Sequence, residues 1–250
     1  MSDARAPDSQ SLLDTIGRAF VPVHRDGYKF VAGAAFATLV LFLIAPPLGW
    51  LGAIATAYCA YFFRDPERVT PARAGLVVSG ADGRIVDATD GVTVPRELPL
   101  GEGRRIRISV FLSVFDVHIV RAPVAGRIVS SLYVPGAFLN AELDKASEEN
   151  ERRALVIETE TGEKIGLVLI AGLVARRIVT FVNDGASVSR NERVGLIRFG
   201  SRVDVYLPSG ARVLVAPGQT AVGGETVLAE LGPQAATDAA QVVRSELMQD

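Results

Sequence analysis

The amino-acid sequence predicts a mainly β protein, of sandwich or barrel type, with an N-terminal helical membrane hairpin. The first observation is an uncharged apolar stretch over Phe30–Phe63, longer than the roughly 20 residues that cross a bilayer once. The second is a change of period after Arg64, where short β-branched runs alternate with Gly, Pro, Asn and Asp. The third is a hydrophobic content of 49% over 250 residues, which suits a large β domain and is too apolar for disorder.

Charge and cysteine usage exclude several function classes. The net charge of −2 gives no support for nucleic-acid binding, which normally shows a basic surplus. A single cysteine rules out an internal disulfide framework and favours a reducing compartment. With only Cys59, His24 and His118 as soft ligands, the sequence predicts no metal site.

Residues 1–29 form a polar N-terminal segment with a short amphipathic run. Leu12, Leu13, Ile16 and Phe20 fall on one helical face. This face packs on the main domain or lies on a membrane surface, and the sequence does not choose between the two. The apolar run that follows starts too late and is too long for a secretory signal.

Residues 30–63 are predicted to form a membrane helical hairpin. Pro46-Pro47, followed by Gly49, divides the stretch into two halves. At about 1.5 Å per residue, a half of about 16 residues reaches about 24 Å, short of a hydrocarbon core of about 30 Å. We therefore expect a shallow hairpin that turns at the prolines. A single proline-kinked span is the alternative, and a buried soluble hairpin is disfavoured because both halves are apolar all round.

The flanks of this stretch predict its orientation. Basic residues stand on both sides, which favours two cytoplasmic ends and places the following domain at the inner face of the cell membrane. Arg64 and Arg68 contact anionic lipids or merely terminate the helix. The basic residues are Arg18, Arg25 and Lys29 before the stretch, and Arg64, Arg68 and Arg73 after it.

Residues 64–232 are predicted to form the β-rich domain, and residues 233–250 an alanine-rich tail. A break at Leu139–Arg153, rich in Glu, Lys, Ala and Asn, predicts a short helix or loop across the sheet. The predicted strands are 76–78, 84–86, 105–112, 126–134, 154–158, 164–170, 176–182, 194–199, 203–207, 212–215 and 226–231.

The segment Val215–Ala229 resembles the flattened β sandwich of biotinyl and lipoyl carrier domains. This likeness implies an architecture of the barrel-sandwich-hybrid type. Such carriers present a lysine on a hairpin tip, and no lysine follows Lys164 here. A carrier role is therefore disfavoured, and only the architecture is expected.

Three segments supply the parts of a base-activated serine: Asp82 before Gly83, His118 between Val117 and Ile119, and the Gly200-Ser201 bond. Each has an ordinary structural interpretation. Asp-Gly is a common turn pair, a histidine in a strand often bonds to a carbonyl, and Gly-Ser often marks a bend or bulge.

The order and spacing of these motifs are similar to those of the phosphatidylserine decarboxylases, in their shorter bacterial and archaeal-type form. Two departures stand out. The family's cleavage motif is commonly Leu-Gly-Ser-Thr and here is Phe-Gly-Ser-Arg, and longer relatives carry a histidine where this chain has Phe115. The matching motifs are Phe62–Pro66, Asp82-Gly83, Val117–Pro123, Pro135-Gly136 with Asn150–Arg152, and Phe199–Ser201.

The resemblance implies a self-cleaving pyruvoyl enzyme without a metal. His118, oriented by Asp82, would deprotonate Ser201, whose hydroxyl attacks the Gly200 carbonyl. The ester then eliminates, leaving a β chain, Met1–Gly200, and an α chain whose first residue, the former Ser201, is a pyruvoyl group. That group would form a Schiff base with the amine of phosphatidylserine, release carbon dioxide and yield phosphatidylethanolamine, with His118 assisting proton transfer.

The resemblance also suggests contacts beyond the reacting groups. Asn150, Arg152 and Arg153 would contact the lipid phosphate, since guanidinium suits phosphate geometry, or would form a solvated charged run. The bilayer is the expected partner of the hairpin. A homo-oligomer is compatible with the sequence, which leaves the oligomeric state open.

Two other functions remain open on the sequence. One is a membrane-tethered serine hydrolase that uses the same three residues, although Ser201 lacks a Gly-x-Ser-x-Gly elbow. The other is a non-catalytic β-sandwich module on a membrane hairpin. Both predict an uncleaved chain.

Overall fold

A computed structural model describes residues 21–136, 150–172, 177–198 and 201–232. The chain divides into two compact units, one ending at Glu67 and one beginning at Arg68, and each is described by itself. The predicted N-terminal amphipathic helix, the tail at 233–250 and residues 199–200 lie outside the described residues.

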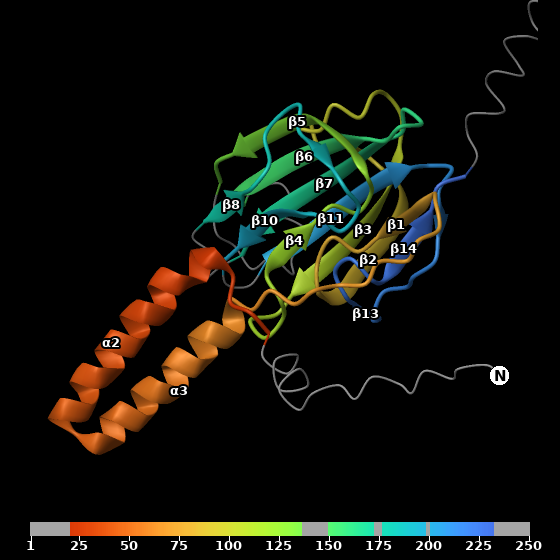
Figure 1. Ribbon diagram of the computed structural model, residues 1–250. Helices are drawn as coiled ribbons and strands as arrows, with labels where there is room; N and C mark the ends of the chain where they lie inside the picture. Colours follow the sequence, from red (N-terminus) through yellow and green to blue (C-terminus); the bar gives the residue numbers. More distant parts are fainter. Residues whose placement is uncertain (1–20, 137–149, 173–176, 199–200, 233–250) are drawn as a thin grey trace, which may run out of the picture. The chain divides into compact units, whose positions relative to one another are not determined.

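The first unit is a pair of apolar helices, α2 (Tyr28–Ile44) and α3 (Pro46–Phe62), preceded by a short 3-10 turn, η1 (Arg25–Gly27). The helices run antiparallel, side by side (Figure 1). The chain reverses at Ala45, whose backbone is extended, and Pro46 and Pro47 begin α3, where a missing N–H costs no hydrogen bond. The hairpin and its turn thus follow the predicted pattern.

Small and polar residues line the contact between the two helices. The hydroxyls of Thr38 and Thr56 lie 2.9 Å apart. A Cβ on Gly52 would lie 2.8 Å from Thr38 Oγ1, so this glycine lets the helices approach closely. At the open end, His24 N donates to Phe63 O at 2.8 Å, which closes the base of the hairpin.

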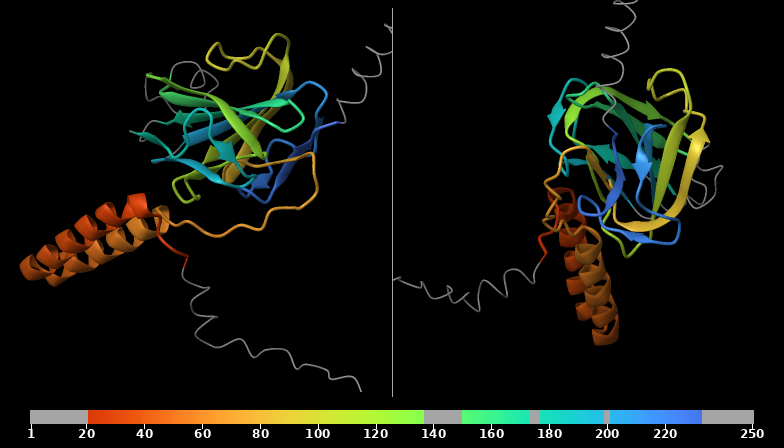
Figure 2. Two further views of the ribbon diagram at one scale, coloured as in Figure 1. Left: turned by 45° about the horizontal axis from the view of Figure 1, so that its top comes forward. Right: turned by 90° about the vertical axis from the view of Figure 1, so that its right-hand side faces the viewer.

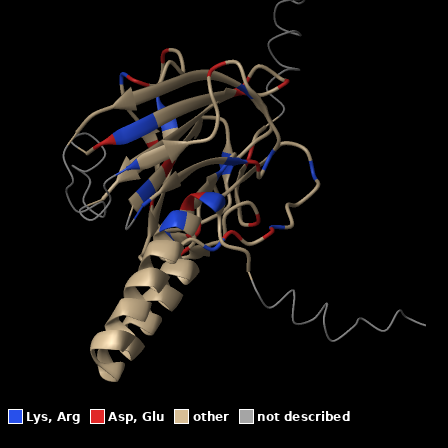
Figure 3. Ribbon diagram, turned by 60° about the vertical axis from the view of Figure 1, so that its left-hand side comes forward, with Lys and Arg blue, Asp and Glu red and all other residues tan. Residues whose placement is uncertain are grey.

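Large apolar side chains cover the outside of the hairpin. Among the described residues, one helix, Arg25–Ile44, is long and apolar enough to cross a membrane by length and composition. Figure 3 shows both helices without acidic or basic residues beyond their base. The most exposed apolar side chains are Phe36, Leu39, Leu43, Ile44, Trp50, Leu51 and Ile54.

The second unit is built from short strands in three sheets, which confirms the mainly β prediction. The strands among the described residues are β1 (Leu76–Val78), β2 (Gly83–Val92), β3 (Arg105–Leu112), β4 (Ile119–Arg121), β5 (Gly126–Val134), β6 (Arg152–Glu158), β7 (Lys164–Ala171), β8 (Ile178–Thr180), β9 (Ser187–Val188), β10 (Arg193–Ile197), β11 (Ser201–Pro208), β12 (Arg212–Val213), β13 (Thr220–Ala221) and β14 (Val227–Glu230).

The largest sheet has the order β13-β2-β3-β11-β7-β6-β5-β9 and curls around the core (Figures 1 and 2). Two three-stranded sheets, β1-β14-β12 and β4-β10-β8, complete the unit. Every neighbouring pair is antiparallel. The main core forms on one face of the large sheet, where Val203, Val205 and Leu207 of β11 pack with residues of all three sheets.

The opposite face of the large sheet carries a second, smaller cluster. Tyr206, Val168 and Val156 pack there beneath Leu98 and Leu100 from the connection between β2 and β3. Because side chains alternate along a strand, β6, β7 and β11 each contribute to both clusters. This explains why β11 is buried along its whole length.

The structure departs from the predicted elements in several places: β2 extends to Val92, beyond the predicted 84–86, and β11 begins at Ser201 rather than at residue 203. The predicted break at Leu139–Arg153 is wrong at its end, because Arg152 and Arg153 belong to β6; residues 139–149 are outside the described part. Pairing with β5 and β7 on both sides overrides the charged composition there. The strands β4, β9 and β13, of two or three residues each, were not predicted.

Candidate active site

Ser201 is the first residue of β11, in the middle of the large sheet. It pairs with Leu112 of β3 on one side and Ala171 of β7 on the other. By alternation its side chain is on the main-core face, with Val203. The residue is 0% exposed, and its hydroxyl has no hydrogen-bond partner among the described residues.

An unpaired buried hydroxyl is costly. Leaving such a group unsatisfied costs about 1–3 kcal/mol, so native proteins keep few of them. Ser109 Oγ on β3 shares this state, but it lies on the other face of the sheet, since Ser109 pairs with Asp204. Ser201 is therefore a buried nucleophile candidate at the start of a strand.

His118 lies in the loop between β3 and β4 and is fully buried. The preceding turn is tied by Asp116, whose carboxylate accepts hydrogen bonds from Ser113 N at 2.8 Å and Ser113 Oγ at 2.7 Å. The imidazole Nδ1 is 2.9 Å from the Asp116 carbonyl oxygen. A carbonyl only accepts, so Nδ1 carries a proton, and in the neutral ring Nε2 is the basic nitrogen.

Asp82 directly precedes β2 and is held by two donors. Arg68 Nη2 donates to Asp82 Oδ2 at 2.6 Å, and Gly223 N donates to Oδ1 at 2.8 Å. Both side chains of the Arg68–Asp82 ion pair are mostly buried, at 14% and 16% exposure. Arg68 is itself fixed, because its carbonyl accepts from Asn191 Nδ2 at 3.1 Å.

The structure brings the three predicted segments to one end of β3. Arg121 N donates to Gly80 O at 2.8 Å, and Ile197 N donates to His118 O at 3.2 Å. A Cβ on Gly80 would lie 3.6 Å from Val203 Cγ1, so the Asp82 segment also approaches β11. Ser201, His118 and Asp82 thus come from neighbouring backbone segments.

The three predicted phosphate contacts differ in their surroundings, and Arg153 Nε donates to Ser131 Oγ at 3.0 Å. Asn150 is fully buried, and its Nδ2 donates to Ala171 O at 2.7 Å. Ala171 is also the residue of β7 that pairs with Ser201. Arg152 forms a hydrogen-bonded ion pair with Glu97. A lipid phosphate would have to compete with that carboxylate for the Arg152 guanidinium.

Two residues near the candidate site make contacts that the sequence analysis did not predict. Arg68 was expected to contact lipids or end a helix, yet its guanidinium binds Asp82. Asp116 supplies the carbonyl on His118 Nδ1, a bond that the sequence assigned to Asp82. Only the two-residue spacing of Asp116 from His118 could have pointed to it. No three His, Cys, Asp or Glu side chains within the described ranges cluster as metal ligands.

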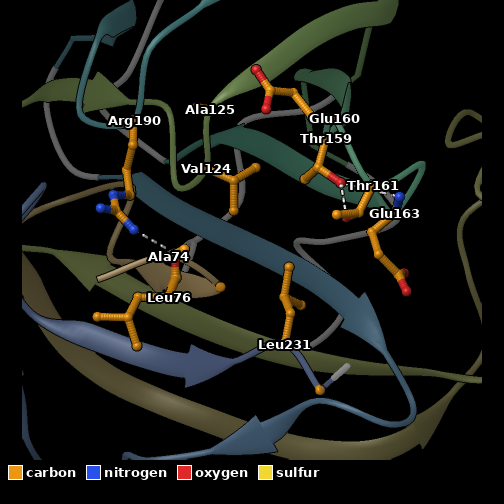
Figure 4. Close-up of a pocket in the computed structure, with 12 residues that line it drawn as sticks. Ala74, Leu76, Val124, Ala125, Thr159, Glu160, Thr161, Glu163, Arg190 and Leu231 are labelled. Atoms are coloured by element: carbon orange, nitrogen blue, oxygen red, sulfur yellow. Dashed lines mark hydrogen bonds between the residues drawn. The ribbon is translucent and has the colours of Figure 1, made fainter. Parts of the chain in front are cut away.

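The second unit also has a pocket of about 600 Å³, and its lining includes neither Ser201, His118 nor Asp82 (Figure 4). Arg190 in its wall donates to the carbonyls of Pro71, Arg73 and Leu76. Because neither Ser201, His118 nor Asp82 lines this pocket, it is not the candidate site for the reaction. The lining includes Leu76, Val124, Thr159, Thr161, Glu163 and Leu231.

Comparison with known proteins agrees with the motifs. Residues 55–229 match the family model described as phosphatidylserine decarboxylase. The chain is also 60% identical, over 209 residues, to the phosphatidylserine decarboxylase proenzyme of Nitrobacter winogradskyi. That match covers 84% of this chain and 84% of the relative. The chain therefore belongs to the phosphatidylserine decarboxylase family.

Proposed function

We propose that this protein decarboxylates phosphatidylserine to phosphatidylethanolamine with a pyruvoyl group that it makes from Ser201. The observation that carries the proposal is the buried, unpartnered Ser201 hydroxyl at the start of β11, close in the fold to the His118 and Asp82 segments. The family membership and the word proenzyme in the relative's name support a processed chain.

The surroundings of Ser201 suit such a group. The side chain is fully enclosed, and a pyruvoyl group has about the same number of heavy atoms as the serine it replaces. When present, this group supplies an electrophilic carbonyl that takes up the electrons freed by loss of carbon dioxide.

The residues of the chain supply the self-cleavage chemistry. His118 Nε2 takes the Ser201 proton, while the Asp116 carbonyl keeps Nδ1 protonated. The hydroxyl oxygen attacks the Gly200 carbonyl carbon, and the peptide bond between Gly200 and Ser201 is replaced by an ester. Asp82, oriented by Arg68 and Gly223 N, stabilises the imidazolium that forms.

During decarboxylation His118 acts a second time, as the group that transfers a proton at the reacting carbon. Its complete burial excludes bulk water and strengthens electrostatic interactions around it. Asn150 and Arg152 are the proposed contacts of the lipid phosphate. For Arg152 this role requires exchange of the Glu97 carboxylate for the phosphate.

The hairpin of α2 and α3 is the proposed membrane anchor. Its exposed apolar side chains are unfavourable in water and favourable in lipid, and its length fits a shallow insertion. Basic residues at both ends favour two cytoplasmic ends, which places catalysis at the inner face of the cell membrane. A substrate that stays in the bilayer then needs to present only its head group.

Intact-mass measurement of the purified full chain tests this function. We expect two fragments, the smaller one without a free amino terminus, and release of carbon dioxide from phosphatidylserine vesicles. Ser201→Ala should remain one inactive chain. Ser109→Ala is the matched control, since it removes the other buried hydroxyl without a hydrogen-bond partner in the described part of the chain, and it should leave cleavage intact.

The same experiment separates the alternatives. A single uncleaved chain that reacts with a fluorophosphonate probe at Ser201 would indicate the serine hydrolase. An uncleaved and unreactive chain, indifferent to Ser201→Ala, would indicate the non-catalytic module. Either result overturns the decarboxylase proposal.

A further inference from the structure

The two residues that flank Val203 on β11 are oppositely charged and deeply buried. Arg202 is 1% exposed and Asp204 is 0% exposed. They form a two-pronged ion pair, with Arg202 Nε 2.7 Å from Asp204 Oδ1 and Nη2 2.8 Å from Oδ2. Because they are two residues apart on one strand, both side chains lie on the same face, opposite Ser201.

A second ion pair accompanies the first on this face. Arg107 of β3, which is paired with Tyr206, binds Asp87 of β2 at 2.9 Å. Burial lowers the pKa of Arg202, but hydrogen bonding and attraction to Asp204 outweigh it and raise the pKa overall. Burial and the charge of Asp204 raise the pKa of Tyr206, so its phenol stays neutral.

Burying an ion pair in this way seldom stabilises a protein by itself. Removing one partner of a buried pair typically costs about 3–5 kcal/mol, whereas replacing both with apolar residues is often neutral. Stability alone therefore does not explain why a two-pronged pair follows Ser201. What the pair does provide is a fixed conformation of the Arg202 side chain directly after Ser201, because both prongs of the guanidinium are held.

We propose that Arg202, locked by Asp204, is the positioning residue that holds Ser201 for self-cleavage and then retains the new chain end in the site. The inference rests on the proposed function. Before cleavage the chain holds Ser201 from both directions. Afterwards residue 201 becomes a terminus, and chain ends fray unless side chains or ladder bonds secure them.

Two fates of the ester make this positioning measurable. In elimination the Cα proton of residue 201 leaves, the Cβ–Oγ bond breaks and Gly200 departs as a carboxylate. The resulting dehydroalanine tautomerises to an imine, and one water replaces ammonia to give the pyruvoyl group. In hydrolysis water attacks the ester carbonyl instead, and serine remains with a free amine. Elimination needs the C–H and C–O bonds aligned, so a loosened strand favours hydrolysis.

The test compares three variants of the full chain with wild type in detergent. Asp204→Asn removes the charge, Arg202→Lys keeps a charge without the fork, and Arg202→Met with Asp204→Leu removes both charges. Intact mass of the small fragment distinguishes pyruvoyl from serine termini. Cleavage rate and melting temperature are measured alongside.

We expect self-cleavage to slow about ten- to a hundred-fold in Asp204→Asn and in the apolar double variant, with serine-terminated fragment rising, and less in Arg202→Lys. Asp87→Asn is the control, since it breaks the neighbouring pair away from Ser201. It should lower the melting temperature without producing serine termini. The double variant keeps the test valid if a lone buried charge prevents folding.

The outcomes distinguish a failure of this inference from a failure of the proposed decarboxylase function. A double variant that cleaves at the wild-type rate, with only pyruvoyl termini, would overturn the positioning role and leave the decarboxylase proposal standing. A wild-type chain that never cleaves would overturn both.

Discussion

At the scale of single residues, two side chains of the candidate site are held in place by neighbouring groups of the chain. His118 has its tautomer set by a backbone carbonyl two residues away, which needs no second side chain. Asp82 is held by a guanidinium and a backbone amide from distant parts of the chain. The first contact places a proton on His118 Nδ1, and the other two orient the Asp82 carboxylate.

The Arg68–Asp82 pair gives the first prediction. Arg68→Met should slow self-cleavage roughly ten-fold, because the Asp82 carboxylate loses its 2.6 Å partner and its orientation. Arg68→Lys should recover part of the rate. Pulse labelling followed by denaturing gels measures the precursor's lifetime.

Arg64→Met is the matched control for that prediction. Arg64 lies four residues earlier, and its guanidinium donates to Tyr61 O at 3.0 Å and covers the Tyr61 ring. It should cleave like wild type. A wild-type rate of self-cleavage in Arg68→Met would show that Arg68 has no role in the reaction.

At the scale of elements, Gly83 joins the Asp82 segment to β2. Its φ is +148°, and a Cβ there would lie 2.1 Å from the carbonyl oxygen of Phe111 in β3. That oxygen belongs to the sheet and cannot move away cheaply. Gly83→Ala should therefore destabilise the second unit by about 2–4 kcal/mol and reduce self-cleavage.

Gly162→Ala is the control that separates the cost of a positive φ from the cost of the steric clash with Phe111. Gly162 also has a positive φ, of +83°, but a Cβ added there would meet nothing within 4 Å. It should cost only about 1 kcal/mol. Thermal melting of both variants in detergent gives the comparison, and equal losses would show that the contact with Phe111 is unimportant.

The hairpin carries the next prediction. Phe36→Asp combined with Ile54→Asp should release much of the protein from membranes, because each buried carboxylate costs about 2.5–3.5 kcal/mol at the centre of a helix. Both side chains are highly exposed on the hairpin. Carbonate extraction measures the membrane-bound fraction.

Leu132→Asp provides the control for the hairpin, since it places the same charge on a half-exposed residue of β5. It should leave membrane attachment unchanged. Retention of the double hairpin variant in the membrane pellet would argue against insertion of α2 and α3.

The same elements show how far the sequence leads. Long periodic strands such as β3 and β5 were predicted at their observed bounds, since alternation over eight or nine residues is a strong signal. Ser201, His118 and Asp82 could be proposed from the sequence because reactive residue types stand in recognisable motifs. The Arg68–Asp82 and Arg202–Asp204 contacts could not be predicted, because they depend on sheet register and on proximity that only the fold creates.

At the scale of the whole molecule, cleavage before Ser201 would divide the β unit without dividing its sheets. The C-terminal fragment supplies β11 between β3 and β7, β13 beside β2, and β14 beside β1. All eight residues of β11 are buried. Its removal would expose the core on both faces and break two ladders of hydrogen bonds. The fragments should therefore stay together without a covalent link.

This arrangement makes stability depend on concentration. Unfolding of the cleaved protein releases two chains, so its melting temperature should rise with protein concentration, by mass action. Ser201→Ala unfolds as one chain and should melt at the same temperature at every concentration. Size-exclusion chromatography in detergent should show one peak for both proteins, and a denaturing gel should resolve two bands only for wild type. A small fragment that elutes separately under native conditions would show that β11 is not held by its neighbours.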